Sequence, residues 1–183
     1  LGYHNVGNGS DCREADDGRE YMVRELLGGD NGGDRLRRAG PLPPRELHRL
    51  MEQVGSGLQA AHDKGIVHRD LKPENIFLVD TGTDKPLAKV LDFGISKIRH
   101  STSVLTRDHS LLGSPFYMSP EQASGLVKTI DHYTDIFAMG SICYHGLTGK
   151  LPFDGPALQG VICQVVHHTQ DPVTAHNPGL PEI

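Results

Sequence analysis

Apolar residues recur at helical spacing through the middle of the chain. After Pro44 they fall at i, i+3, i+4, i+7, i+11 and i+14, at Leu47, Leu50, Met51, Val54, Leu58 and Ala61. This spacing places them on one face of an amphipathic helix. Pro44 suits the first turn of such a helix, and Gly65 suits its end. The pattern therefore predicts a helix with one buried face from about Pro44 to Gly65.

A second long helix is predicted for residues 130–149, with the sequence IDHYTDIFAMGSICYHGLTG. Its apolar residues lie on several faces: Ile136, Met139, Ile142, Cys143 and Leu147. A helix that is apolar nearly all round is buried, and Gly149 is placed to cap its end. A shorter helix is expected from Ala157 to His168.

Three β-rich runs complete the pattern. Residues 21–27 (YMVRELL) predict a short strand, and residues 75–80 (NIFLVD) and 87–93 (LAKVLDF) predict a hairpin around the turn TGTDKP. Residues 7–12 (GNGSDC) are interpreted as a turn, residues 28–33 (GGDNGG) as unusually flexible, and residues 100–113 as a loop. The order predicts an α+β fold, mainly helical, with a small β element at one edge.

Composition narrows the class of protein. The formal net charge of −5 over 183 residues argues against a general nucleic-acid binder, which shows a basic face. Cys12, Cys143 and Cys163 are odd in number and far apart, which disfavours a disulfide framework and predicts a cytoplasmic location. No run reaches the ~18 apolar residues of a membrane helix. Because the chain begins at Leu1, we expect it to be a piece of a longer protein. A membrane anchor of that longer protein would lie outside these 183 residues.

Four polar side chains flank the predicted hairpin. Asp70, Lys72 and Asn75 lie in the stretch HRDLKPEN just before it, and Asp92 follows it, directly before Phe93 and a glycine. A hairpin brings its two ends together, so Asn75 and Asp92 are expected to be close. Phosphoryl transfer needs a carboxylate to accept a hydroxyl proton, a cation, and hard oxygen ligands for Mg²⁺. Each residue alone is ordinary in turns and on surfaces, but the ordered set predicts this chemistry.

Successive segments of the chain resemble eukaryotic-like (Hanks-type) bacterial serine/threonine protein kinases. They are HRDLKPEN, DFG, GSPFYMSPEQ and YTDIFAMGSICYHGLTGKLPF, in that order. The resemblance implies transfer of the ATP γ-phosphoryl group to Ser/Thr hydroxyls of protein substrates. It implies Asp70 as catalytic base, Lys72 near the γ-phosphate, and Asn75 and Asp92 on Mg²⁺. Lys72 resembles the serine/threonine branch of the family rather than the tyrosine kinases.

The resemblance also assigns supporting roles. On the nucleotide side, Glu25 and Leu27 are expected to offer hinge backbone groups, and Phe77 to form the floor of the adenine pocket. Further roles fall on residues around the acceptor and the catalytic loop: Ser114 near the acceptor, Glu121 as the glutamate of Ala-Pro-Glu, Asp135 as the anchor of the loop backbone, and His68 and Phe93 as packed spine members.

Arg69 precedes the proposed base. In the family this arginine pairs with a phosphate on the activation segment through charge-assisted hydrogen bonds. The candidate phosphate carriers are hydroxyl residues of the predicted loop: Thr106 and Ser110, with Ser101, Thr102 and Ser103.

The chain also departs from the family pattern. Residues 1–27 correspond to the end of the N-lobe and the hinge, and residues 28–183 to an incomplete C-lobe. The Gly-rich loop and most of the N-lobe are expected to be missing. The conserved lysine of the N-lobe strand that follows this loop is expected to be missing too, because the first lysine of the chain is Lys64. The last C-lobe helices, which supply an arginine partner for Glu121, are expected to be missing too. Arg24 stands at the gatekeeper position, where a buried, unpaired guanidinium is costly, and Gly32 stands where an apolar residue packs the next helix.

Two interpretations remain. One is a serine/threonine kinase whose 183-residue piece is inactive alone, supported by the complete set Asp70, Lys72, Asn75 and Asp92. The other is a non-catalytic pseudokinase or interaction module, supported by Arg24, the glycine-rich hinge and the missing lobe.

Overall fold

The computed structural model describes residues 4–7, 9–14, 17, 20–83, 85–93 and 115–180, and for residues 9–14 and 20–24 it describes the backbone only. The elements in chain order are β1 (Gly9–Glu14), β2 (Glu20–Arg24), β3 (Gly29–Asn31), α1 (Gly32–Ala39), α2 (Pro44–His62), the 3-10 turn η1 (Pro73–Asn75), β4 (Ile76–Val79), β5 (Leu87–Val90), η3 (Pro115–Tyr117), α3 (Pro120–Ala123), η4 (Val127–Thr129), α4 (His132–Thr148), α5 (Leu158–His167) and α6 (Val173–His176). None of the described helices is long and apolar enough to cross a membrane.

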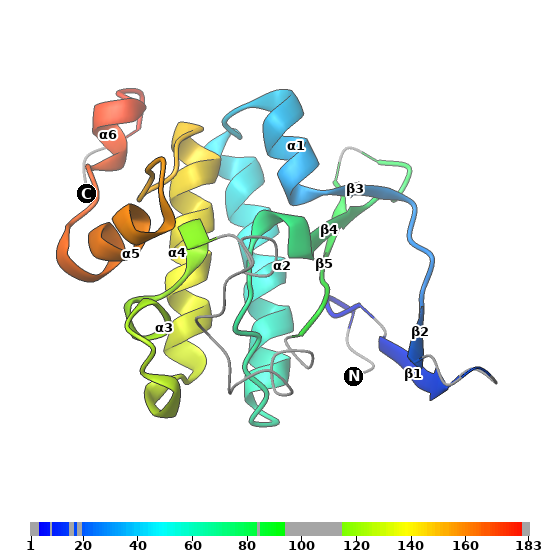
Figure 1. Ribbon diagram of the computed structural model, residues 1–183. Helices are drawn as coiled ribbons and strands as arrows, with labels where there is room; N and C mark the ends of the chain where they lie inside the picture. The colour runs from blue at the N-terminus through cyan, green and yellow to red at the C-terminus, as the bar shows by residue number, and fades with distance from the viewer. Residues whose placement is uncertain are drawn as a thin grey trace.

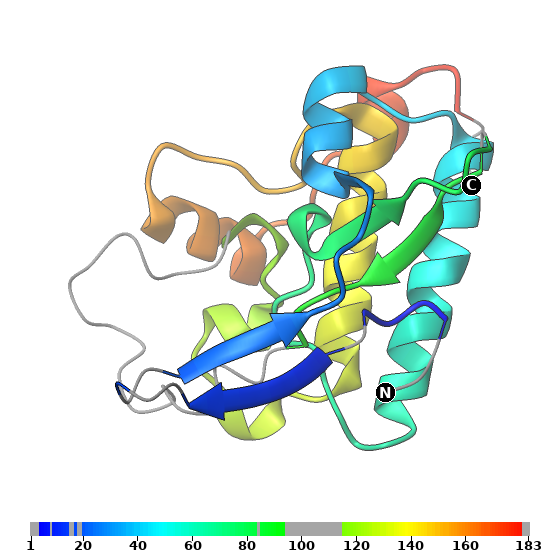
Figure 2. The same ribbon diagram turned by 90° about the vertical axis from the view of Figure 1, so that its right-hand side faces the viewer.

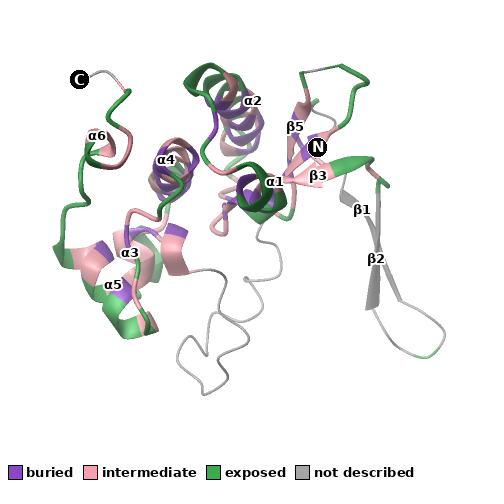
Figure 3. Ribbon diagram, turned by 90° about the horizontal axis from the view of Figure 1, so that it is seen from above, coloured by how far each residue is buried: buried purple, intermediate pink, exposed green. Residues whose placement is uncertain are grey.

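Helices α2 and α4 run side by side through the middle of the molecule (Figure 1). Helices α3, α5 and α6 lie on the α4 side, and the antiparallel sheet β3-β4-β5 lies on the α2 side. The hairpin β1–β2 forms a separate sheet that projects from the body (Figure 2). The buried residues concentrate where α2 and α4 face each other and the sheet (Figure 3).

The predicted helix after Pro44 is confirmed. The six apolar positions that define its face are all buried: Leu47, Leu50, Met51, Val54, Leu58 and Ala61. Pro44 is its first residue, and Gly65 adopts a positive φ of 71° in the turn that follows. The amphipathic spacing therefore identified the main packing face correctly.

Helix α4 was predicted to be buried all round, and this was wrong for one face. Ile136 is 51% exposed and Tyr133 is 67% exposed. The buried face carries Ile142, one of the predicted apolar residues, together with Thr134 and Asp135, whose polar atoms are hydrogen-bonded. Gly149 caps the helix end as predicted, at φ 69°, with its N–H donating to the carbonyl of His145.

The interpretation of residues 7–12 as a turn was wrong from residue 9 onward. Residues 9–14 form β1, which pairs antiparallel with β2. Strand β2 itself ends at Arg24, three residues earlier than predicted, and residues 25–28 are irregular. Strand β1 is rich in polar residues, so it lacked the apolar run that marks a strand.

Most of the glycine-rich stretch 28–33, predicted to be flexible, is regular structure: residues 29–31 form β3 and residues 32–33 begin α1. Gly29 has φ 139°, and a Cβ there would lie 2.1 Å from the carbonyl oxygen of Leu78 on the paired strand β4. A Cβ on Gly32 would lie 2.8 Å from the carbonyl oxygen of Pro73. Glycine is used here for close backbone approach, so an apolar side chain at position 32 has no room.

We expect Gly29→Ala to lower the free energy of unfolding by about 2 kcal/mol or more, because alanine is strained at this φ and clashes with β4. Urea unfolding followed by circular dichroism measures the change. Gly28→Ala is the matched control, since a Cβ on Gly28 meets no atom within 4 Å. Equal stability of the two variants would contradict this account of β3.

The hairpin β4–β5 is confirmed, with Ile76 opposite Val90. The N-terminal segment 4–7 lies against its outer strand. The backbone carbonyl of Asn5 accepts a hydrogen bond from the N–H of Val90 at 2.9 Å. The N–H of Gly7 donates to the carbonyl of Val90, also at 2.9 Å. Val6 is 2% exposed. Strand β5 is thus paired on both sides, which fixes the end of the hairpin that leads to Asp92.

Candidate active site

The loop that follows α2 is held by one buried carboxylate on α4. Asp135 accepts hydrogen bonds from the backbone N–H groups of His68 and Arg69, both at 2.8 Å. His62, at the end of α2, places its Nε2 2.7 Å from the same carboxylate. Asp135 has no exposed surface. One side chain therefore joins the end of α2, the loop and α4, in the position that the sequence predicted for an anchor.

Arg69 has an unusual backbone and side chain. Its φ of 67° is in the left-handed region, which non-glycine residues rarely adopt. Its carbonyl accepts a hydrogen bond from Gln122 Nε2 at 2.7 Å, which connects the loop to α3. Its Nε is buried and has no hydrogen-bond partner within the described part of the chain. A buried guanidinium nitrogen of this kind favours an anionic partner.

His68 is a packed residue, as its position in the motif implied. Its Nε2 lies 2.8 Å from the carbonyl oxygen of Leu91, its Nδ1 accepts the N–H of Asp70 at 3.2 Å, and its ring packs against Phe93 at 4.8 Å. Burial lowers the pKa of His68 from its usual 6.5. Only the neutral ring with a proton on Nε2 satisfies both hydrogen bonds, because a proton on Nδ1 would face another N–H.

This geometry predicts a pH dependence of stability. Because the pKa of His68 is lower in the folded than in the unfolded state, its contribution is present above about pH 6.5 and is lost as the pH falls below it. His68 can change the free energy of unfolding by at most about 1.4 kcal/mol per pH unit. When the free energy of unfolding is measured with urea at several pH values between 7.5 and 5.5, it should depend less steeply on pH in His68→Phe than in the unchanged protein. His167→Gln, at an exposed histidine, is the control and should show the same pH dependence as the unchanged protein. If His68→Phe also showed that pH dependence, His68 would not be its source.

The predicted catalytic residues Asp70, Lys72 and Asn75 lie together on this loop. Lys72 Nζ is 3.3 Å from Asp70 Oδ2, and both side chains are partly exposed. Asn75 is buried at the end of η1, and its Nδ2 donates to the carbonyl of Asp70 at 2.7 Å. This bond joins η1 to the backbone of the loop. The partly exposed carboxylate of Asp70 is accessible to a hydroxyl group whose proton it could accept, and Lys72 places a cation beside that position.

Asp92 lies at the other end of the hairpin, as predicted. Leu91 N–H donates to the carbonyl of Asn75 at 2.8 Å, which brings the two segments together. Asp92 is exposed and has φ 56°. No group of three His, Cys, Asp or Glu residues suitable for a metal occurs among the described residues. One amide oxygen and one carboxylate fit Mg²⁺ that completes its shell with phosphate oxygens and water.

The residues predicted for the nucleotide side lie beside the sheet. Glu25, just after β2, forms an ion pair with Lys89 on β5 at 2.8 Å. Phe77 is half-buried on β4, opposite Lys89 in the strand register. Leu27 is half-buried and Leu26 is 99% exposed. The Glu25–Lys89 pair was missed because its members are 64 residues apart and only the fold brings them together; the side chain of Arg24 lies outside the described residues.

The segment after the undescribed stretch 94–114 is fixed to α4. Tyr117, in η3, is buried, and its hydroxyl is 2.7 Å from His145 Nδ1. Burial raises the pKa of Tyr117 and lowers the pKa of His145, so this is a hydrogen bond between neutral groups. The sequence did not predict this pair. The predicted positions in this stretch lie outside the described residues: Ser114, Thr106, Ser110, Ser101, Thr102 and Ser103.

Glu121 has a partner of its own within the described chain. Thr134 Oγ1 on α4 donates to its carboxylate. Burial alone would raise the pKa of Glu121. Hydrogen bonds from Thr134, from its own backbone N–H and from Ser119 outweigh this effect, so the pKa is lowered. Ser119 also caps α3 together with Gln122. The expected arginine is thus not required to keep this carboxylate ionised.

A model of the protein kinase domain family matches residues 9–179. The chain belongs to this family, which confirms the resemblance seen in its motifs and the mainly helical α+β fold. It is 39% identical over 171 residues to "Serine/threonine-protein kinase pkn3" of Myxococcus xanthus, covering 92% of this chain and 31% of that protein. It is 36% identical over 182 residues to "Serine/threonine-protein kinase PrkC" of Bacillus subtilis, covering 100% and 27%. The chain therefore spans less than a third of the length of these relatives.

Proposed function

We propose that this chain carries the catalytic loop, the Mg²⁺ ligands and the acceptor-binding segment of a protein serine/threonine kinase. The reaction is transfer of the γ-phosphoryl group of ATP to Ser or Thr hydroxyls of proteins. The observation that carries the proposal is the cluster of Asp70, Lys72 and Asn75 on a loop anchored by Asp135. Asp92 follows Leu91, whose N–H donates to the carbonyl of Asn75. The names of the relatives, serine/threonine-protein kinases, support the same substrate class.

In this mechanism Asp70 accepts the proton of the acceptor hydroxyl as its oxygen forms a bond to the γ-phosphorus. The bond from that phosphorus to the β,γ-bridging oxygen breaks, and ADP leaves. Lys72, whose Nζ lies 3.3 Å from Asp70, would offset charge on the transferred group. Asn75 and Asp92 would hold Mg²⁺, which when bound neutralises charge on the β- and γ-phosphates.

The nucleotide contacts belong to the same proposal. Backbone groups of Glu25 and Leu27 would bind the adenine edge, and Phe77 would lie under the ring. The Glu25–Lys89 ion pair supports this assignment, because it ties the segment after β2 to the sheet. Binding of adenine to the backbone groups of a segment that is already fixed costs less conformational entropy than binding to a mobile one.

Regulation is proposed at Arg69. Its buried Nε has no hydrogen-bond partner within the described residues, and a phosphate on Thr106 or Ser110 would supply oxygen acceptors. Ser114 would lie near the acceptor, and Glu121 and Asp135 would hold the surrounding elements. We place the kinase domain in the cytoplasm, because Cys143 and Cys163 are free thiols, as expected in a reducing compartment.

The test is transfer of radiolabelled phosphate from ATP to matched peptides that differ only in Ser, Thr or Tyr as acceptor. We expect Mg²⁺-dependent labelling of the Ser and Thr peptides, absent in Asp92→Asn. Because its first lysine is Lys64, the 183-residue chain alone should be at least about 100-fold slower than the 1–100 s⁻¹ typical of kinases, so labelling is followed over hours. Equal labelling of the Tyr peptide, or labelling of the Ser and Thr peptides that persists in Asp92→Asn, would overturn the proposal.

A further inference from the structure

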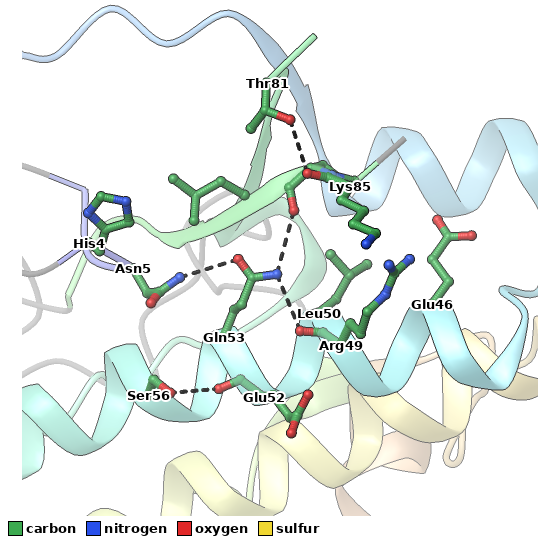
Figure 4. Close-up of a pocket in the computed structure, with 12 residues that line it drawn as sticks. His4, Asn5, Glu46, Arg49, Leu50, Glu52, Gln53, Ser56, Thr81 and Lys85 are labelled. Carbon is green, nitrogen blue, oxygen red and sulfur yellow. Dashed lines mark hydrogen bonds between the residues drawn. The ribbon is translucent and has the colours of Figure 1, made fainter. Parts of the chain in front are cut away.

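A groove lies on the face of the molecule formed by α2, the turn between β4 and β5, and the N-terminal segment. Its volume is about 480 Å³, within the range of roughly 300–1,000 Å³ found for ligand sites. Figure 4 shows Arg49 and Gln53 on the α2 side, Thr81 and Lys85 on the turn, and Asn5 at one end. None of these residues belongs to the catalytic cluster described above.

The floor of the groove is fixed by Gln53. Its Oε1 accepts the N–H of Ala88 at 3.0 Å, and its Nε2 lies 3.3 Å from the carbonyl oxygen of Arg49 and 3.5 Å from that of Pro86. The wall at Asn5 is fixed too, because Asn5 Nδ2 donates to the carbonyl of Ala88 at 2.9 Å. A groove with preformed walls binds at a lower entropic cost than one that must be ordered.

Arg49 and Lys85 give the groove its chemical character. Their charged groups point toward each other at one end of it (Figure 4). Neither forms an ion pair in the described part of the chain, whereas Arg35, Arg38 and Lys89 each have a carboxylate partner. Two cations that face each other repel, and an anion between them relieves that repulsion.

The carboxylates nearby do not fill this role. Glu46 lies at the same end of the groove, but its carboxylate is 2.8 Å from Arg35 and is engaged there. Glu52 lies 3.4 Å from His48, and Figure 4 shows it turned away from the β4–β5 turn. Pro86 and Leu87 add half-buried apolar surface to the lining. The groove thus has a cationic end, and part of its lining is half-buried apolar surface.

We propose that this groove docks a linear segment of a partner protein that carries Asp or Glu beside an apolar side chain. A carboxylate lies between Arg49 and Lys85, and the neighbouring apolar side chain rests on Pro86 and Leu87. Charge complementarity selects the segment, and the fixed walls orient it. Docking here does not depend on the proposed kinase activity, so binding is measured on the chain directly.

The probe is a fluorescein-labelled decapeptide of alternating Glu and Leu, followed by fluorescence anisotropy. We expect saturable binding with a dissociation constant between about 1 μM and 1 mM, which weakens as salt is added. The double variant R49Q/K85Q should bind at least about tenfold more weakly, a change of about 1.4 kcal/mol. The double variant R45Q/K128Q removes the same charge from exposed positions outside the groove and should bind within about twofold of the unchanged chain.

Three results would overturn the proposal. The first is equal weakening in the two double variants, which would indicate only non-specific attraction. The second is equally tight binding of the matched decapeptide of Gln and Leu. The third is displacement of the Glu–Leu peptide by inorganic phosphate beyond the effect of chloride at matched ionic strength, which would make the groove a site for small anions. Thermal melting checks that R49Q/K85Q keeps the fold, since both residues are exposed.

Discussion

Asp135→Ala is expected to lower the free energy of unfolding by about 3–5 kcal/mol. The carboxylate is fully buried and binds the N–H groups of His68 and Arg69 and the ring of His62. Alanine leaves these donors without an acceptor in the interior, and a buried unsatisfied donor is expensive. Since domains are stable by only about 5–15 kcal/mol, the loss should be visible as a large fall in the urea midpoint.

Asp131→Ala is the matched control for this prediction. Asp131 is an exposed aspartate that caps the same helix through the N–H of Tyr133, and loss of such a cap costs about 1 kcal/mol. Asp135→Asn, which keeps one acceptor oxygen, should fall between the two. If Asp135→Ala were no less stable than Asp131→Ala, the carboxylate would not be the anchor of the loop.

The parts of the fold that the sequence predicted are those with a local signal. The buried face of α2 follows from the spacing of Leu47, Leu50 and Leu58, and the β4–β5 hairpin from two apolar runs around a turn. Asn75 and Asp92 were expected to be near each other for the same reason, because a hairpin brings its ends together. The ordered set of motifs identified the family, since few unrelated chains contain all of it.

The parts that the sequence did not predict depend on contacts between distant residues. Strand β1 is polar and is stabilised by pairing with β2, and Gly29 lies in a strand because β4 approaches it closely. Tertiary context overrides local propensity at such places. The pairs Glu25–Lys89 and Tyr117–His145 likewise have no signal in the local sequence.

Asp70→Asn is expected to lower the rate of phosphoryl transfer by about 10²–10⁴-fold, the usual contribution of a general base. The amide has nearly the same shape as the carboxylate but does not accept the hydroxyl proton. The side chain is partly exposed, so the free energy of unfolding should change by less than about 0.5 kcal/mol. Labelling of the Ser and Thr peptides with radioactive ATP measures the rate, and urea unfolding checks the fold.

Asp63→Asn removes the same charge at an exposed aspartate just after α2 and should leave the rate unchanged. Lys72→Met tests the second member of the pair, because its ammonium lies 3.3 Å from Asp70. If the two groups act on the same step, the double variant Asp70→Asn/Lys72→Met should be little slower than Asp70→Asn, since residues that act as a unit are not additive. A rate for Asp70→Asn above about one tenth of the unchanged rate would contradict its role as base, because even a weak general base contributes about 10².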